Sequence, residues 1–266
     1  MTTSHNQFGF KKGISCSHAI RVVRSAVDTI IKGGNTANVC AIDLSKAFDR
    51  VNHHALFFKL MKRLIPNELF ALLECWLSTC YSCVKYLVKF TINFGVLDFG
   101  VRQGSVLSPI LFAVYVDDLA NLCTFSRGLR IVLYADDILL LAPSISALES
   151  LLNLCERELD QLDMVINNKK SCCICIGSRS NITCAAISMS TGAIIPWMDE
   201  IGYLDVFIVR SRLFKCSLDH AKKSFYRSVN AIFGKVGQFA SEEVTLQLIK
   251  SKCIRPLIRF RSMSFK

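Results

Sequence analysis

Short apolar runs at residues 131–133 and 138–141 flank two adjacent carboxylates, Asp136 and Asp137. Branched residues dominate both runs, which is typical of buried strands, so the pattern predicts a hairpin with the carboxylate pair at its turn. Two like charges held side by side at the edge of a core destabilise the folded state unless a cation compensates them. A divalent metal with oxygen ligands would do so. The alternative is a solvated turn, where Asp is common.

A further carboxylate follows a strand-like pattern earlier in the chain. Residues 39–42 form an apolar run that leads directly into Asp43. If this strand is a neighbour of the predicted hairpin, Asp43 lies beside the carboxylate pair at one edge of a sheet. Taken alone, Asp43 is explained better as the cap of a short turn. Asp49 is expected to pair with Lys46 or Arg50.

Apolar residues at helical spacing, with local start signals, predict a chain rich in helices. Ser17 and Ser146 are candidate helix caps, and Glu149 completes a capping box with Ser146. His53 and His54, adjacent at a helix start, are expected to face solvent. The predicted helices span residues 17–33, 53–64, 66–80, 108–122 and 146–167, and two basic helical patterns follow at 218–260. Further strands are predicted at residues 172–176, 182–189 and 203–209, with a hairpin around Gly95 at 81–99.

A polar loop with glycines at residues 100–107 precedes a helix start at Ser108 and Pro109. Arg102 and Gln103 offer hydrogen-bond donors, and Gly104 permits close approach to the backbone. Such a loop can bind a phosphate or the edge of a nucleotide. It can equally be an ordinary capped turn.

Composition indicates a globular protein with a sizeable core, since 52% of the 266 residues are apolar and 20% are charged. The net charge of +11, without a basic tail block, favours a polyanionic partner, nucleic acid before a membrane surface. No apolar run reaches the roughly 18 residues that a membrane span needs. We therefore expect no membrane partner.

The 13 cysteines and the polar start of the chain, which lacks a signal-peptide pattern, predict a reducing, intracellular compartment. The densest cysteine group is Cys172, Cys173 and Cys175, with Cys184 beyond. Strand alternation would place Cys172 and Cys173 on opposite faces, and no second paired-cysteine unit follows, so a zinc site is disfavoured.

Taken in order, these motifs resemble the reverse transcriptases, and most closely those of non-LTR (LINE-type) retrotransposons. The resemblance covers nearly the whole chain, and its three central motifs in this order are highly specific. The central motifs lie at residues 41–49, 102–109 and 134–137, with supporting motifs at 7–10, 167–170 and 203–204.

The resemblance implies an α+β fold: a right-hand polymerase palm, with an antiparallel sheet flanked by helices, partial fingers and a partial helical thumb. The implied divisions are 1–38 partial fingers, 39–52 palm with the first carboxylate strand, 53–104 fingers or palm insertion, 105–210 palm and 211–266 partial thumb or connection.

The implied activity is RNA-directed DNA synthesis with an RNA template, a DNA primer and dNTPs. Two Mg²⁺ ions, or Mn²⁺ as a substitute, would be held by Asp43 and Asp136, with Asp137 in support. Phe48 would lie under the sugar and exclude a 2′-hydroxyl, or it could belong to the core. Lys170 would donate a proton to pyrophosphate, with Lys169 as the alternative. The dNTP pocket would be lined by Arg102, Gln103 and Gly104.

The chain departs from the family pattern in two places. Asp205 stands where the family usually has a glycine. We also expect the family's fingers segment upstream of Gln7, and its endonuclease domain, to be missing. We therefore expect an N-terminally truncated domain, nuclear or cytoplasmic, with an intact carboxylate triad and low or absent activity. The oligomeric state stays open. The alternatives are a catalytically dead palm remnant that binds nucleic acid and a phosphodiester-cleaving metalloenzyme, which Phe48 and the Gln103–Gly104 loop argue against.

Overall fold

The computed structural model describes residues 3–11, 13–79, 81–86, 89–96, 99–102, 104–122, 128–236 and 239–254. At its centre is a four-stranded antiparallel sheet in the order β4-β5-β1-β6. The strands are β1 (Ala37–Ile42), β4 (Arg130–Tyr134), β5 (Asp137–Ala142) and β6 (Cys172–Ile176). The predicted strand at 39–42, the predicted hairpin at 129–141 and the strand at 172–176 are all present.

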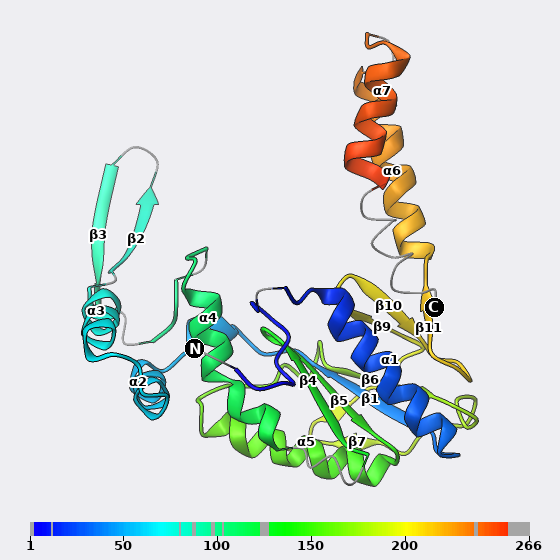
Figure 1. Cartoon of the computed structure of the whole chain (residues 1–266), viewed down its shortest axis with the longest axis horizontal. Helices are drawn as coiled ribbons and strands as arrows, with labels where there is room; N and C mark the ends of the chain where they lie inside the picture. Colours follow the sequence, from blue (N-terminus) through cyan, green and yellow to red (C-terminus); the bar gives the residue numbers. More distant parts are fainter. Residues whose placement is uncertain are drawn as a thin grey trace.

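Helices cover both faces of this sheet because side chains alternate along each strand. Cys40, Ile42 and Leu140 face one core, which includes the buried stripe of α5 (Ile145–Asp160). Val39 and Leu141 face a second core with α1 (Cys16–Lys32). The two helices therefore lie on opposite sides of the sheet (Figure 1). A mixed α+β fold with an antiparallel sheet flanked by helices is thus confirmed.

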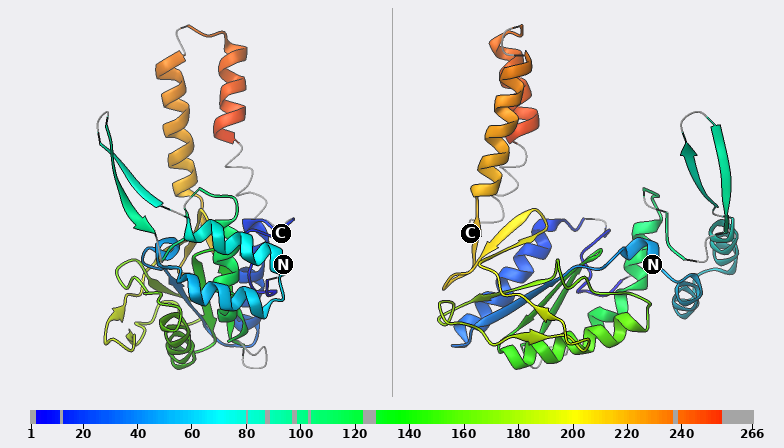
Figure 2. Two further views of the ribbon diagram at one scale, coloured as in Figure 1. Left: turned by 90° about the vertical axis from the view of Figure 1, so that its left-hand side faces the viewer. Right: turned by 180° about the vertical axis from the view of Figure 1, so that it is seen from behind.

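Two projections extend from the central sheet. One consists of α2 (His53–Lys62), α3 (Asn67–Ser78) and the hairpin of β2 (Tyr81–Tyr86) and β3 (Lys89–Val96). The other consists of α6 (Asp219–Val236), α7 (Glu242–Leu248) and a π-helical turn (Ile249–Ile254). Both rise on the same side of the molecule, at its two ends (Figure 1, Figure 2). α6, which the structure describes throughout, buries none of its residues.

Smaller elements connect these parts. The 3-10 helix η1 (Ala47–Arg50) follows β1, and α4 (Ser108–Tyr115) leads into a second 3-10 helix, η2 (Asp117–Asn121). A two-stranded sheet pairs β7 (Ile187–Ser188) with β8 (Ile194–Ile195). A three-stranded sheet in the order β11-β10-β9 contains β9 (Glu200–Tyr203), β10 (Val206–Val209) and β11 (Lys215–Ser217).

Several predicted boundaries are wrong. The helix caps are Ser15 and Ser144, each two residues before the serine expected to cap. The helix expected to reach residue 167 ends at Asp160, and the one expected to reach residue 122 ends at Tyr115 before η2. The strand expected at 182–189 is confined to β7, and the run at 203–209 contains the turn between β9 and β10. In the hairpin at 81–99, Gly95 lies within β3 rather than at the turn.

Candidate active site

The strand register brings Asp43 to the turn that carries Asp136 and Asp137. Ile42, the last residue of β1, is paired with Ile138, the second residue of β5, so Asp43 and Asp137 extend the same antiparallel pair by one position. Tyr134 pairs with Asp137, which leaves Ala135 and Asp136 as the two residues of the turn. Adjacent strands lie about 4.8 Å apart. Three predicted site carboxylates therefore meet at one edge of the sheet.

Burial and the neighbouring negative charges raise the pKa of one of these carboxylates. The pKa of Asp137 is raised from 3.8 to about 6, first by burial of its carboxyl group and then by the charges of Asp136, Asp43 and Asp205. A raised carboxylate pKa means that the ionised form lacks compensation in the folded protein. The environment of Asp137 therefore favours either a proton or a cation.

Asp205 is a site residue that the sequence did not place here. It follows Leu204 in the turn between β9 and β10, and both residues have positive φ angles, 49° and 64°. Positive φ at both central positions is the backbone of a type I′ turn, where glycine or asparagine is preferred. The one signal in the sequence was the aspartate in place of the expected glycine.

Lys170 lies beside the first carboxylate. Its Nζ is 3.8 Å from Asp43 Oδ2, with both side chains substantially exposed to solvent. The Asn167 N–H donates to the Asp43 carbonyl at 2.8 Å, and the Asp43 N–H donates to Ser171 Oγ at 3.1 Å. Residues 167–171 therefore hold the backbone of Asp43 and present Lys170 to it. The neighbouring Lys169 donates its backbone N–H to Asn167 Oδ1 at 3.2 Å.

Phe48 lies in η1, five residues beyond Asp43. Its ring is half-buried and stacks on Phe112 of α4, with ring centroids 4.7 Å apart. The Phe48 carbonyl accepts a hydrogen bond from Val101 N–H at 2.8 Å. This contact places the start of the 100–104 loop next to Phe48, although the ring also contributes to the core.

The backbone conformation of the 100–104 loop explains why it contains glycine at positions 100 and 104. Gly100 has a φ of +90°, and a Cβ there would lie 3.1 Å from the carbonyl oxygen of Asp49. Gly104 has a φ of +86° with open space around it, and Arg102 is exposed. Gln103, predicted to bind the dNTP, lies outside the described residues. Arg102 and Gly104 are therefore open to solvent, whereas Val101 is buried.

His53, expected to face solvent, is buried instead. Its Nε2 lies 2.7 Å from the carbonyl oxygen of Gly100. This partner comes from 47 residues away, which a local pattern cannot reveal. Its contact fixes the base of the 100–104 loop against α2.

The donor set at the sheet edge consists of carboxylate oxygens, which suits Mg²⁺. The register that places Asp43 beside the turn of Asp136 and Asp137 is the observation that fits a divalent cation, and the raised pKa of Asp137 agrees with it. Over the part of the chain that the structure describes, no group of three or more His, Cys, Asp or Glu side chains is arranged to hold a metal ion. On β6, Cys173 and Cys172 face different cores, as alternation predicted.

Comparisons with known proteins agree with the motifs. The family model described as reverse transcriptase (RNA-dependent DNA polymerase) matches residues 1–208. The RNA-directed DNA polymerase from mobile element jockey of Drosophila funebris is 29% identical over 231 residues, covering 82% of this chain and 25% of that protein. The probable RNA-directed DNA polymerase from transposon BS of Drosophila melanogaster is 33% identical over 143 residues, covering 52% and 16%. The chain thus spans a quarter or less of the length of these relatives.

A solved structure is similar in fold. The apo telomerase from Candida tropicalis superposes with a TM-score of 0.60 at 12% identity, covering 98% of this chain and 48% of that one. At this identity the likeness concerns the fold alone. Among the described residues, no helix combines the length and apolar character needed to cross a membrane.

Proposed function

The chain belongs to the reverse transcriptase family, of the non-LTR retrotransposon type, and from this premise we propose that it extends a DNA primer with dNTPs along an RNA template. The observation that supports this activity is the meeting of Asp43 with the turn of Asp136 and Asp137 at one sheet edge. Lys170 next to Asp43 supplies a cation at the same place.

Two Mg²⁺ ions, for which Mn²⁺ can substitute, are the proposed cofactors. Asp43 and Asp136 would hold them and Asp137 would support them, because hard oxygen ligands from two strands match the preference of Mg²⁺. When bound, the ions would stabilise the charge that develops on the attacking and leaving oxygens. The raised pKa of Asp137 supports this assignment, since burial and the neighbouring carboxylates disfavour its negative charge and a cation would compensate it.

The remaining residues would position substrate and move one proton. The Phe48 ring would lie against the sugar and exclude a 2′-hydroxyl, while its stack on Phe112 holds the ring in place. Arg102, Gln103 and Gly104 would form the wall against the dNTP. Lys170, whose Nζ lies 3.8 Å from Asp43 Oδ2, would protonate the departing pyrophosphate.

The proposed architecture is a right hand. Residues 39–52 and 105–210 would form the palm, and 1–38 would form partial fingers. Residues 53–104 would form fingers or a palm insertion, and 211–266 a partial helical thumb or connection. Exposed cations along α6 would track the phosphates of the RNA–DNA hybrid. They are Lys222, Lys223, Arg227 and Lys235. A nuclear or cytoplasmic location stays a prediction.

A nucleic-acid-binding module without catalysis is the second candidate. It is favoured by Asp205, which adds a third carboxylate charge near Asp137, and by the net charge of +11. Because the Asp205 carboxylate adds negative charge near the proposed metal ligands, we expect the polymerase activity of this chain to be weak.

Primer extension on an RNA template with Mg²⁺ or Mn²⁺ tests the proposal, with hybrid binding measured at two salt concentrations in parallel. We expect slow extension that Asp136→Asn abolishes while binding persists. Salt-sensitive binding without incorporation would favour the binding module. Robust extension would contradict the expected weakness, and extension that survives Asp136→Asn would contradict the assigned site.

A further inference from the structure

The segment at residues 4–9 lies along the free edge of β4 and extends the central sheet. Phe8 N–H donates to the Leu133 carbonyl at 2.8 Å, and Leu133 N–H donates to the Asn6 carbonyl at 2.9 Å. Gln7 forms a parallel bridge with Leu133. The segment therefore runs beside the strand that leads into the carboxylate turn.

The Gln7 side chain reaches the turn itself. It is completely buried, and its Oε1 accepts hydrogen bonds from Gly9 N–H at 2.9 Å and from Ala135 N–H at 3.4 Å. Ala135 has a φ of +57°, a left-handed conformation that costs a non-glycine residue about 1–2 kcal/mol. A backbone held in such a conformation needs support from its surroundings. Gln7 provides a partner for the Ala135 N–H.

Gly9 shows how closely the segment fits the turn. A Cβ at Gly9 would lie 2.5 Å from the backbone nitrogen of Ala135. That distance is shorter than any allowed contact, so only glycine permits the segment to pass here. Gln7 and Gly9 together enclose the backbone of the residue that precedes Asp136.

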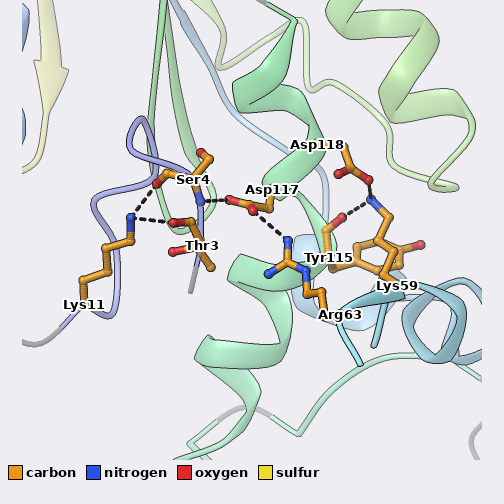
Figure 3. A network of polar contacts seen from close by, with 8 residues as sticks. All are labelled: Thr3, Ser4, Lys11, Lys59, Arg63, Tyr115, Asp117 and Asp118. Atoms are coloured by element: carbon orange, nitrogen blue, oxygen red, sulfur yellow. Dashed lines mark hydrogen bonds and ion pairs between the residues drawn. The ribbon is translucent and has the colours of Figure 1, made fainter. Parts of the chain in front are cut away.

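The other end of the segment is anchored to the helices beside the sheet (Figure 3). Ser4 N–H donates to Asp117 Oδ1 at 2.8 Å, and Nη2 of Arg63, the residue that follows α2, lies 2.6 Å from Asp117 Oδ2. Asn6 Nδ2 donates to the Ala120 carbonyl at 3.2 Å. These contacts with η2 fix the position from which Gln7 reaches the turn.

We propose that Gln7 is a positioning residue that fixes the backbone at Ala135 and thereby orients the Asp136 carboxylate. The catalytic consequence of this inference rests on the proposed polymerase function. The support of the Ala135 backbone by Gln7 does not depend on that function. Gln7 touches neither substrate nor reacting atoms in this assignment. It acts through the turn.

The test compares Gln7→Met, which keeps the length and removes the acceptor, with Gln7→Glu, which keeps an acceptor oxygen in either protonation state. Asn38→Leu is the matched control, because Asn38 is a buried polar residue at the opposite end of β1 from Asp43. The readouts are amide hydrogen exchange at Ala135, Mn²⁺ affinity of the protein alone, and kcat and KM for dNTP incorporation.

We expect Gln7→Met to speed exchange at Ala135 about tenfold, as loss of one hydrogen bond to a buried backbone group implies, beyond the effect of Asn38→Leu. Mn²⁺ affinity and kcat should fall while KM changes little, and Gln7→Glu should restore slow exchange. In Gly9→Ala the added Cβ would collide with the backbone nitrogen of Ala135 and displace the turn. This variant should therefore also accelerate exchange at Ala135.

Two results would overturn the inference: exchange at Ala135 no faster in Gln7→Met than in Asn38→Leu, or unchanged kcat in an active enzyme with unchanged Mn²⁺ affinity. If the unaltered chain extends no primer, the proposed function fails. The exchange and Mn²⁺ measurements then still decide the role of Gln7.

Discussion

Lys170 Nζ lies 3.8 Å from Asp43 Oδ2, so the candidate proton donor and a candidate metal ligand form an ion pair. The side chains of Lys170 and Asp43 are 70% and 41% exposed, and solvent-exposed pairs of this kind contribute at most about 1 kcal/mol to stability. The pair is therefore easily separated when a metal ion or pyrophosphate competes for either partner.

Lys170→Met should therefore impair catalysis much more than stability. We expect kcat for primer extension to fall about 10²-fold, the lower end for loss of a general acid, with little change in Tm. Lys169→Met is the matched control and should retain activity. Equal losses in the two variants would show that the position of Lys170 beside Asp43 has no catalytic meaning.

The pKa of Asp137 predicts how stability depends on pH. Because its folded pKa, about 6, is above the ordinary 3.8, the folded state binds more protons between these values, and stability falls as pH rises through that window. In metal-free buffer, Asp137→Asn should raise Tm near neutral pH and lose this advantage below the ordinary pKa. Thermal denaturation across pH measures this, with Asp160→Asn, an exposed residue at the end of α5, as control. Mg²⁺ should reduce the Tm difference between Asp137→Asn and the unaltered protein. A lower Tm for Asp137→Asn at neutral pH in metal-free buffer would contradict the prediction.

Replacement of Asp205 by glycine should increase both the stability of the protein and its rate of primer extension. Glycine adopts a φ of 64° without strain, so Asp205→Gly should stabilise the protein by about 1 kcal/mol. It should also lower the pKa of Asp137, because it removes a nearby negative charge. Primer extension should become faster. Asp205→Asn separates the two effects, because it removes the charge and keeps a side chain at the turn. Faster extension in Asp205→Gly alone would assign the defect to the backbone instead of the charge.

Phe48 should control the choice of sugar. Phe48→Val would open space beside the sugar, so we expect incorporation of rNTPs relative to dNTPs to rise. Phe112→Leu is the control for packing, since it removes the stacking partner and keeps the Phe48 ring. Unchanged discrimination in Phe48→Val would assign Phe48 to the core only.

The ion pair of Arg63 and Asp117 should matter for folding. Asp117 is 5% exposed, so Arg63→Met would leave a buried carboxylate without this cation, at a cost of about 3 kcal/mol. Urea denaturation measures the loss. Adding Asp117→Asn to Arg63→Met should recover part of it, because the buried charge is then gone. Additive losses in the double variant would exclude coupling between the two residues.

The central sheet was predictable because its strands are short apolar runs whose polar boundaries, Asp43 and Asp136, mark where burial stops. The caps were not predictable in the same way. Ser15 and Ser17, like Ser144 and Ser146, are equally good caps by local chemistry. Local chemistry therefore does not distinguish Ser15 from Ser17, or Ser144 from Ser146, as the start of a helix.

Contacts between segments that are far apart in the chain could not be predicted from the sequence. The burial of His53 depends on the Gly100 carbonyl, and the approach of Asp205 to Asp137 depends on how β9 and β10 pack beside the sheet. Gln7 belongs to a motif that the sequence identified, but its hydrogen bond to Ala135 spans 128 positions. Local patterns contain no information on such pairings.

The strand order β4-β5-β1-β6 has a consequence during synthesis of the protein. β1 leaves the ribosome with two unpaired edges, and its partners β5 and β6 begin only at Asp137 and Cys172. The Asp43 N–H finds its acceptor, Ser171, 128 residues later. Pairings this distant in sequence form slowly and leave apolar strands open to aggregation in the nascent chain. Until residue 176 has emerged, β1 therefore lacks at least one of the two strands that cover its edges in the folded sheet.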